Sequence, residues 1–187
     1  MALDKIILLL IHLSINGIRG KTLLQKRIYF LSIFLKNNFG YRAHYYGPYS
    51  PQVDDSLAKM KSLGFVEERS HGYGLIDKIG FEVRRYDYLL TDDGGKIVDN
   101  YIKENNEEFR KIKTVFDCLC NSGDTWEDHI SLSIAAKIHY IFTMNNSPLK
   151  ITEIEKKAQN LGWNITPEQS TRAISFLEKL NLIETQH

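Results

Sequence analysis

The spacing of apolar residues in the first half of the chain predicts three helices and then two strands. A first helix is expected over 3–16, because its apolar side chains recur near the period of 3.6 residues, and Gly17 ends it. The apolar positions of this helix are Ile6, Leu9, Leu10, Leu13 and Ile15. A second helix is expected over 21–36, where apolar residues cover more than one face, which indicates a central place in the core.

Local start signals define a third helix over 51–62. Ser50 is expected to cap this helix, and Pro51 stands at the first helical position, where its missing N–H is not needed. The side chains expected to face inward are those of Val53, Leu57 and Met60. The preceding segment 41–46 is short, aromatic and alternating, which suits a strand or an extended segment.

Two strands are expected after the third helix. They cover 65–69 and 81–90, and the glycine-containing segment 70–80 between them is expected to be a loop. The order helix, helix, helix, strand, loop, strand is that of a winged helix. We therefore expect a mainly α (α+β) fold class, with a winged helix-turn-helix domain over residues 1–95.

The next part of the chain is predicted to be helical. Thr91 is expected to cap a helix that reaches Glu104, and another helix follows over 106–120. The turn-forming residues 121–124 mark the clearest internal break. We therefore assign residues 96–123 to a helical connector.

Residues 124–187 are expected to form a second, winged-helix-like helical domain. Its first helix is predicted over 132–144, and a capping box of Thr152 with Glu155 predicts the next one. Thr166 is expected to cap the last helix. The residues that this helix is expected to bury are Ala173, Ile174, Leu177 and Leu180. The pattern is a second helix-turn-helix with no hairpin after it.

The composition is that of an ordinary globular protein. Of its residues, 43% are apolar and 25% are charged. A length of 187 residues is enough for one domain or two small ones. Lys and Arg number 24 against 23 Asp and Glu, and a net charge of +1 gives no global attraction to nucleic acid or membranes. The longest apolar run, 6–11, is too short for a membrane span. Two cysteines exclude a disulfide framework, so we expect a cytoplasmic protein.

The charge is unevenly spread along the chain. The first forty positions carry six basic residues and one acid, a local charge of +5, which leaves −4 on the remainder. Basic residues around the second helix, the third helix and the second strand are therefore candidate contacts to DNA phosphates. These candidates are Arg19, Lys21, Lys59, Lys61, Arg84 and Arg85. Asp54 and Asp55 oppose this interpretation, because they lie near the end of the third helix that normally enters the major groove.

The tyrosine-rich segment 41–49 has two interpretations. Half of it can pack into the core while the rest covers the turn, or it can form a platform for a protein partner, since tyrosine is enriched at interfaces. The candidate partner-binding residues are Tyr45, Tyr46, Tyr49 and Gln52. Base stacking on these rings would need dense flanking charge, which the segment itself lacks.

The chain lacks the common enzymatic motifs: GxxxxGK[ST], GxGxxG, HExxH and GxSxG are all absent. Cys118 and Cys120 do not have the CxxC spacing of a zinc or redox site, and we expect buried structural thiols. His129 lies beside Glu127 and Asp128, a cluster typical of a solvated loop or helix start. We therefore expect no catalytic residues, no metal and no cofactor.

Two segments carry a resemblance to known families. Residues 21–30 read KTLLQKRIYF, and residues 45–50 read YYGPYS, so a long helix is followed by a tyrosine-glycine-proline turn. Over roughly residues 1–100 the chain resembles the prokaryotic YwgA-like and Panacea families, the latter including the SocA-like antitoxins. The resemblance implies a winged-helix-like core that serves regulation, defence or toxin–antitoxin biology, and it brings no catalytic residues.

Two functional hypotheses follow. The first is a non-enzymatic winged-helix regulator or antitoxin-like protein that contacts double-stranded DNA mainly through phosphates. The second is a protein-interaction adaptor that binds a toxin or phage-defence effector through the tyrosine-rich turn and binds no DNA. Neither involves a membrane. A homodimer formed through the helices between 96 and 120 is compatible with both hypotheses.

Overall fold

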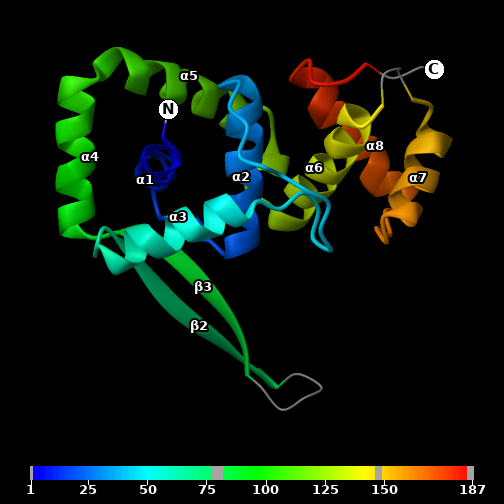
Figure 1. Ribbon diagram of the computed structural model, residues 1–187. Helices are drawn as coiled ribbons and strands as arrows, with labels where there is room; N and C mark the ends of the chain where they lie inside the picture. Colours follow the sequence, from blue (N-terminus) through cyan, green and yellow to red (C-terminus); the bar gives the residue numbers. More distant parts are fainter. Residues whose placement is uncertain (1, 77–81, 146–148, 185–187) are drawn as a thin grey trace.

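A computed structural model describes residues 2–76, 82–145 and 149–184. The protein is mainly helical and has a small three-stranded antiparallel sheet (Figure 1), so the expected α+β class is confirmed. Over these residues the helices are α1 (Leu3–Leu13), α2 (Lys21–Phe34), α3 (Pro51–Ser62), α4 (Asp92–Glu104), α5 (Asn106–Cys120), the short 3₁₀ helix η1 (Asp124–Trp126), α6 (His129–Thr143), α7 (Ile151–Asn160) and α8 (Pro167–Lys179). No helix within the described ranges is long and apolar enough to cross a membrane.

Helix α1 occupies the centre of the N-terminal half. It is seen nearly end-on in Figure 1, framed by α2, α3, α4 and α5, which explains why all residues of 6–11 are buried. The helix ends earlier than predicted, at Leu13. Ile15, predicted on its apolar face, is 97% exposed, because the chain leaves the helix at Ser14 and turns toward the sheet. Helix α2 is buried on several sides, as predicted.

The sheet has the strand order β1-β3-β2 and consists of β1 (Ile18–Arg19), β2 (Val66–Ile76) and β3 (Glu82–Leu90). The prediction of a loop from residue 70 is wrong as far as Ile76, since β2 continues to that residue; residues 77–80 lie outside the described chain. Cross-strand pairing with β3 holds this segment in a strand: Gly72 lies opposite Arg84 and Ile76 opposite Glu82, with an irregular register between the two pairs. The β2–β3 hairpin projects from the helices (Figure 1), and Val66 alone of β2 is buried.

Side-chain caps begin several helices as predicted. The Ser50 hydroxyl accepts a hydrogen bond from the Val53 N–H at the start of α3, and Thr91 caps α4 in the same way. Thr166 and Gln169 form a reciprocal capping box at α8. The capping box predicted at Thr152 is wrong, because α7 begins at Ile151 and Lys150 occupies the capping position. The backbone N–H of Lys150 donates to the carboxylate of Glu153.

The C-terminal helices pack on α2. Phe30 of α2 meets Phe176 of α8 edge to face at 5.7 Å, and the Tyr29 hydroxyl lies 2.7 Å from His139 Nδ1 of α6. The Trp163 indole N–H donates to the His44 carbonyl at 2.7 Å. Helix α8 buries the four residues expected of it, namely Ala173, Ile174, Leu177 and Leu180. Residues from both halves therefore contribute to one hydrophobic cluster.

Candidate functional site

Residues 21–30 of α2 and residues 45–50 before α3 hold each other in place. From α2, the Gln25 amide donates to the Ser50 carbonyl and to Asp54 Oδ1, both at 2.9 Å, while its oxygen accepts from the Ser50 N–H at 3.1 Å. Lys26 Nζ donates to the Pro48 carbonyl at 2.7 Å. The turn before α3 is therefore fastened to α2 by buried side-chain hydrogen bonds. These residue types have a structural role, because each satisfies a buried backbone group.

Lys26 and Arg27 belong to the six basic residues counted near the N-terminus, yet both are buried. Burial, with Lys137 nearby, lowers the pKa of Lys26 to about 7. The Arg27 guanidinium donates to the Trp126 carbonyl, to the Ser14 hydroxyl and, at 2.7 Å, to Glu127. Neither side chain is available to a ligand.

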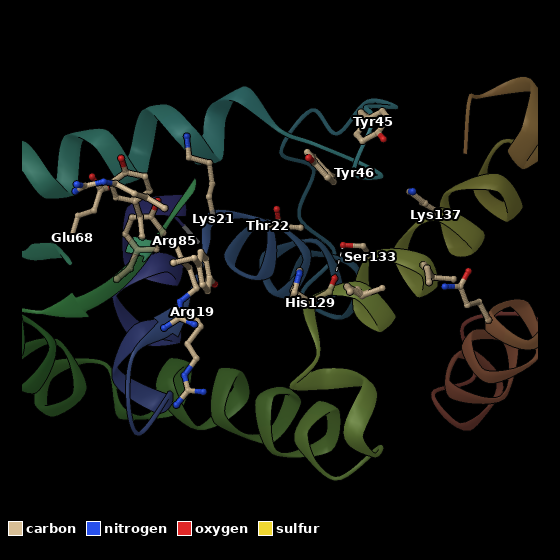
Figure 2. Close-up of a pocket in the computed structure, with 18 of the residues that line it drawn as sticks. Arg19, Lys21, Thr22, Tyr45, Tyr46, Glu68, Arg85, His129, Ser133 and Lys137 are labelled. Carbon is tan, nitrogen blue, oxygen red and sulfur yellow. Dashed lines mark hydrogen bonds between the residues drawn. The ribbon is translucent and has the colours of Figure 1, made fainter. Parts of the chain in front are cut away.

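A cleft of about 1080 Å³ lies between the base of the β2–β3 hairpin, the start of α2 and helix α6. Figure 2 shows Arg19, Lys21 and Arg85 on one side, and Lys137 with Tyr45 and Tyr46 on the other. The charged side chains that line the cleft are six basic ones, Arg19, Lys21, Lys61, Arg84, Arg85 and Lys137, and one acidic one, Glu68. The lining thus carries +5, although the whole chain carries +1.

Four of the six cations already have a carboxylate partner. Lys61 contacts Glu68 at 2.7 Å, and Arg84 contacts Glu82 at 2.6 Å. The same holds for Lys21, which contacts Asp54 at 2.9 Å, and for Arg85, which holds Asp87 through two hydrogen bonds of 2.7 and 2.9 Å. These partners weaken the attraction of the four cations for a further anion but do not block their exposed donors.

Arg19 and Lys137 are the two cleft cations that form no ion pair with any described residue. Arg19 is exposed and lies opposite Asp87 in the sheet register, but that carboxylate is taken by Arg85. Lys137 is half-buried beside the Trp163 ring, and its burial lowers its pKa. An anion in the cleft would offset the energetic cost of desolvating the Lys137 ammonium group, because a nearby negative charge stabilises the charged form.

Of the five tyrosines that line the cleft, Tyr45 and Tyr46 belong to the turn before α3. Tyr45 is 71% exposed and Tyr46 is 57% exposed, and their rings meet edge to face with centroids 4.9 Å apart. The following residue, Gly47, has φ +92°, and a Cβ there would lie 3.0 Å from Lys137 Cγ. Glycine therefore lets the turn pack directly against α6, which places both rings beside Lys137.

The cleft brings together most of the residues singled out from the sequence. Five of the six phosphate-contact candidates line it, and the sixth, Lys59, lies outside and pairs with Asp4 at 2.5 Å. Of the partner-binding candidates, Tyr45 and Tyr46 line it. Tyr49 and Gln52 do not: the Tyr49 hydroxyl donates to Asp54 at 2.7 Å, and Gln52 is exposed on α3.

The Asp54 carboxylate, counted against DNA binding from the sequence, serves inside the protein. Burial opposes its ionisation, but hydrogen bonds from Lys21, Tyr49 and Gln25 hold the pKa of Asp54 below its usual value. Its charge is thus compensated by its own neighbours. Asp55 stays exposed on α3.

Lys137 was not among the candidates from the sequence, although its isolation in a largely apolar helix marks it. It is the single Lys or Arg of α6, HISLSIAAKIHYIFT, in which most other positions are apolar or small. A lone cation in such a helix has no local partner, and its surroundings come from the packing of α6 on α2. Tyr73 and Tyr86 of the hairpin were also not singled out, and both line the cleft.

No group of three or more potential metal ligands occurs among the described residues. His129 is exposed at the start of α6, as expected. The expectation of buried thiols is wrong for Cys118, which is exposed, because α5 buries the face with Ile112 and Phe116. Partial burial raises the pKa of Cys120 to about 11, so this thiol is a poor nucleophile. Compared with known proteins, the chain matches no family model and no curated sequence.

Proposed function

We propose that the protein is a non-enzymatic winged-helix regulator of the cytoplasm, with an antitoxin-like role, that binds DNA through phosphate contacts in the basic cleft. The observation that carries the proposal is the concentration of charge: the lining carries +5, or +2 when the ion-paired carboxylates of Asp54, Glu82 and Asp87 are counted with it, in a chain of net charge +1. Such segregation gives a nearly neutral protein a local attraction for a polyanion.

The arrangement of elements supports a winged helix. Three helices precede the β2–β3 hairpin, and the short strand β1, between α1 and α2, pairs with β3 of that hairpin. Arg84 and Arg85 lie on β3, which corresponds to a wing strand. Among the acids of α3 that would meet a phosphate backbone, Asp54 is compensated within the protein.

The test is the salt dependence of binding to a mixed pool of double-stranded DNA, followed by fluorescence anisotropy. Release of counterions makes the logarithm of the binding constant fall with a slope of about −0.9 for each phosphate neutralised. We expect a slope between about −1.8, if Arg19 and Lys137 alone contact phosphates, and about −5.4, if all six cations do. Absence of binding at low salt, or a slope near zero, would contradict the proposal.

A protein-binding adaptor is the second candidate, favoured by the exposure of Tyr45 and Tyr46. Large exposed aromatic side chains are typical centres of protein interfaces. In that case Tyr46→Ala would abolish capture of a toxin or defence effector encoded nearby, and the wild-type protein would not bind duplex DNA. DNA binding with the expected salt slope decides against this candidate.

A further inference from the structure

We propose that the cleft accepts an unpaired strand of DNA, with a base stacked on Tyr45 or Tyr46 and backbone phosphates held by Arg19 and Lys137. This inference rests on the proposed function, since it takes nucleic-acid phosphates as the anions of the cleft, and it names the form of DNA that the cleft recognises.

The aromatic surface is the first line of evidence. Both tyrosines are more than half exposed, Tyr45 at 71% and Tyr46 at 57%. Neither hydroxyl forms a hydrogen bond with a described residue. The two rings stand perpendicular, so one face of a ring can receive a planar base while its edge stays supported by the other ring. Stacking on tyrosine is how proteins hold single strands without reading their sequence.

The charge beside these rings is the second line of evidence. The segment 41–49 lacks dense charge of its own, but the fold supplies it from elements distant in the sequence. Lys137 of α6 touches the turn that carries the tyrosines, and Arg19 and Arg85 lie across the cleft. A strand that crosses the cleft therefore meets tyrosine rings and cations on both sides, and Tyr45 and Tyr46 are the most exposed of these rings. This is the combination of stacking and electrostatic attraction that single-strand sites use.

The shape of the site is the third line of evidence. Readers of duplex DNA insert a protruding helix or ribbon into a groove of about 12 Å width. The β2–β3 hairpin projects in that way, whereas Tyr45, Tyr46 and Lys137 line a recess of about 1080 Å³ at its base. Recesses of about 300–1000 Å³ normally hold ligands of small-molecule size, which corresponds to a few nucleotides and not to a duplex. A duplex can contact the rim, whereas an unpaired strand can enter.

The test compares one oligonucleotide of about 12 nucleotides as a single strand and as its duplex, because single-strand sites span about 4–16 nucleotides. Anisotropy measures the affinity of both for the wild type, for Tyr45→Ala/Tyr46→Ala and for Tyr45→Phe/Tyr46→Phe. The phenylalanine pair is the matched control, because it retains both rings. A 2-aminopurine base in the strand reports stacking through quenching of its fluorescence. Circular dichroism checks that each variant is folded.

We expect the wild type to bind the single strand about tenfold more tightly than the duplex, and the alanine pair to lose about tenfold or more for the single strand. Duplex affinity should change by less than about twofold, and the phenylalanine pair should behave like the wild type. The quenching should disappear in the alanine pair. Equal affinity of the alanine pair and the wild type for the single strand, or a wild-type preference for the duplex, would overturn the inference.

The two proposals fail in different ways. Salt-dependent duplex binding together with unaffected alanine variants would overturn the unpaired-strand inference and leave the proposed function standing. Absence of binding to either form of DNA at low salt would overturn both.

Discussion

The basic residues of this protein divide into two groups with opposite surroundings. Lys26 and Arg27 are adjacent in α2 and are 2% and 3% exposed. Both donate hydrogen bonds to backbone carbonyls, and Arg27 also donates to the side chains of Ser14 and Glu127. Arg19 and Lys137, far apart in the sequence, line an open cleft and form no ion pair with a described residue. The first group builds the fold, and the second gives the cleft its uncompensated charge.

This contrast shows why local charge is a poor guide to a binding surface. The count of +5 over the first forty residues includes two cations that cannot reach a ligand, and it leaves out Lys137 altogether. Burial of a charged group is costly unless it is hydrogen-bonded, and both buried side chains donate to buried groups, Lys26 to the Pro48 carbonyl and Arg27 to the Trp126 carbonyl and the Ser14 hydroxyl. The predictions below separate the two groups experimentally.

The largest effect is expected from Arg27→Ala. The substitution removes the donors that hold the Trp126 carbonyl and the Ser14 hydroxyl, and it leaves a cavity beside the Trp126 ring. Glu127 is 71% exposed and stays solvated, so the loss comes from the Trp126 carbonyl and the Ser14 hydroxyl, which each lose a donor at a cost of about 1–3 kcal/mol. Urea denaturation should show a loss of that size in the free energy of unfolding, with unchanged DNA affinity of the folded protein. A loss below about 1 kcal/mol would contradict the structural role.

Lys26 is expected to make stability depend on pH. Its pKa is about 7 in the folded protein and about 10.4 in the unfolded chain, so between these values the unfolded chain binds more protons. The free energy of unfolding should therefore rise with pH in this window and lose this contribution as pH falls toward 7. From about pH 7.5 to 9.5 the wild type should gain about 2–3 kcal/mol relative to Lys26→Met. Parallel pH profiles of the two proteins would show that Lys26 is not desolvated.

Gln25→Ala should destabilise the protein by a smaller amount. It leaves the backbone N–H of Ser50 without its partner at the start of α3, and an unsatisfied buried group costs about 1–3 kcal/mol. Gln52→Ala is the matched control, because Gln52 is an exposed glutamine in the first turn of α3. The stability of this variant should stay within about 0.5 kcal/mol of the wild type. Equal stability of the two variants in thermal or urea denaturation would contradict a stabilising role for the hydrogen bonds between Gln25 and Ser50.

The starts of α3 and α8 could be predicted from the sequence because their signals are local. Ser50 with Pro51, and Thr166 with Gln169, form caps within four residues of each other. The length of β2 could not be predicted in this way. Its glycines favour a loop, and the pairing with β3 that holds this segment in a strand is a contact between separate segments.

The candidate site was predictable in part. Five of its six cations were candidates from the sequence, whereas the sixth candidate, Lys59, lies outside the cleft that Lys61 lines. Residues two apart on a helix point about 200° away from each other, so only one of them could face the cleft. Lys137 could not be assigned, because its place beside Tyr46 depends on the packing of α6 against α2, whose sequences are about 100 residues apart.

The most direct test of the account is the salt slope of duplex binding for Arg19→Gln/Lys137→Gln. A matched control, Lys103→Gln/Arg110→Gln, removes the same types of charge from exposed positions outside the cleft. We predict that the cleft variant binds about tenfold more weakly at low salt, with a slope shallower by about 1.8, while the control resembles the wild type. An equal change in both variants would show that DNA senses only the net charge and would contradict the basic cleft as the binding site.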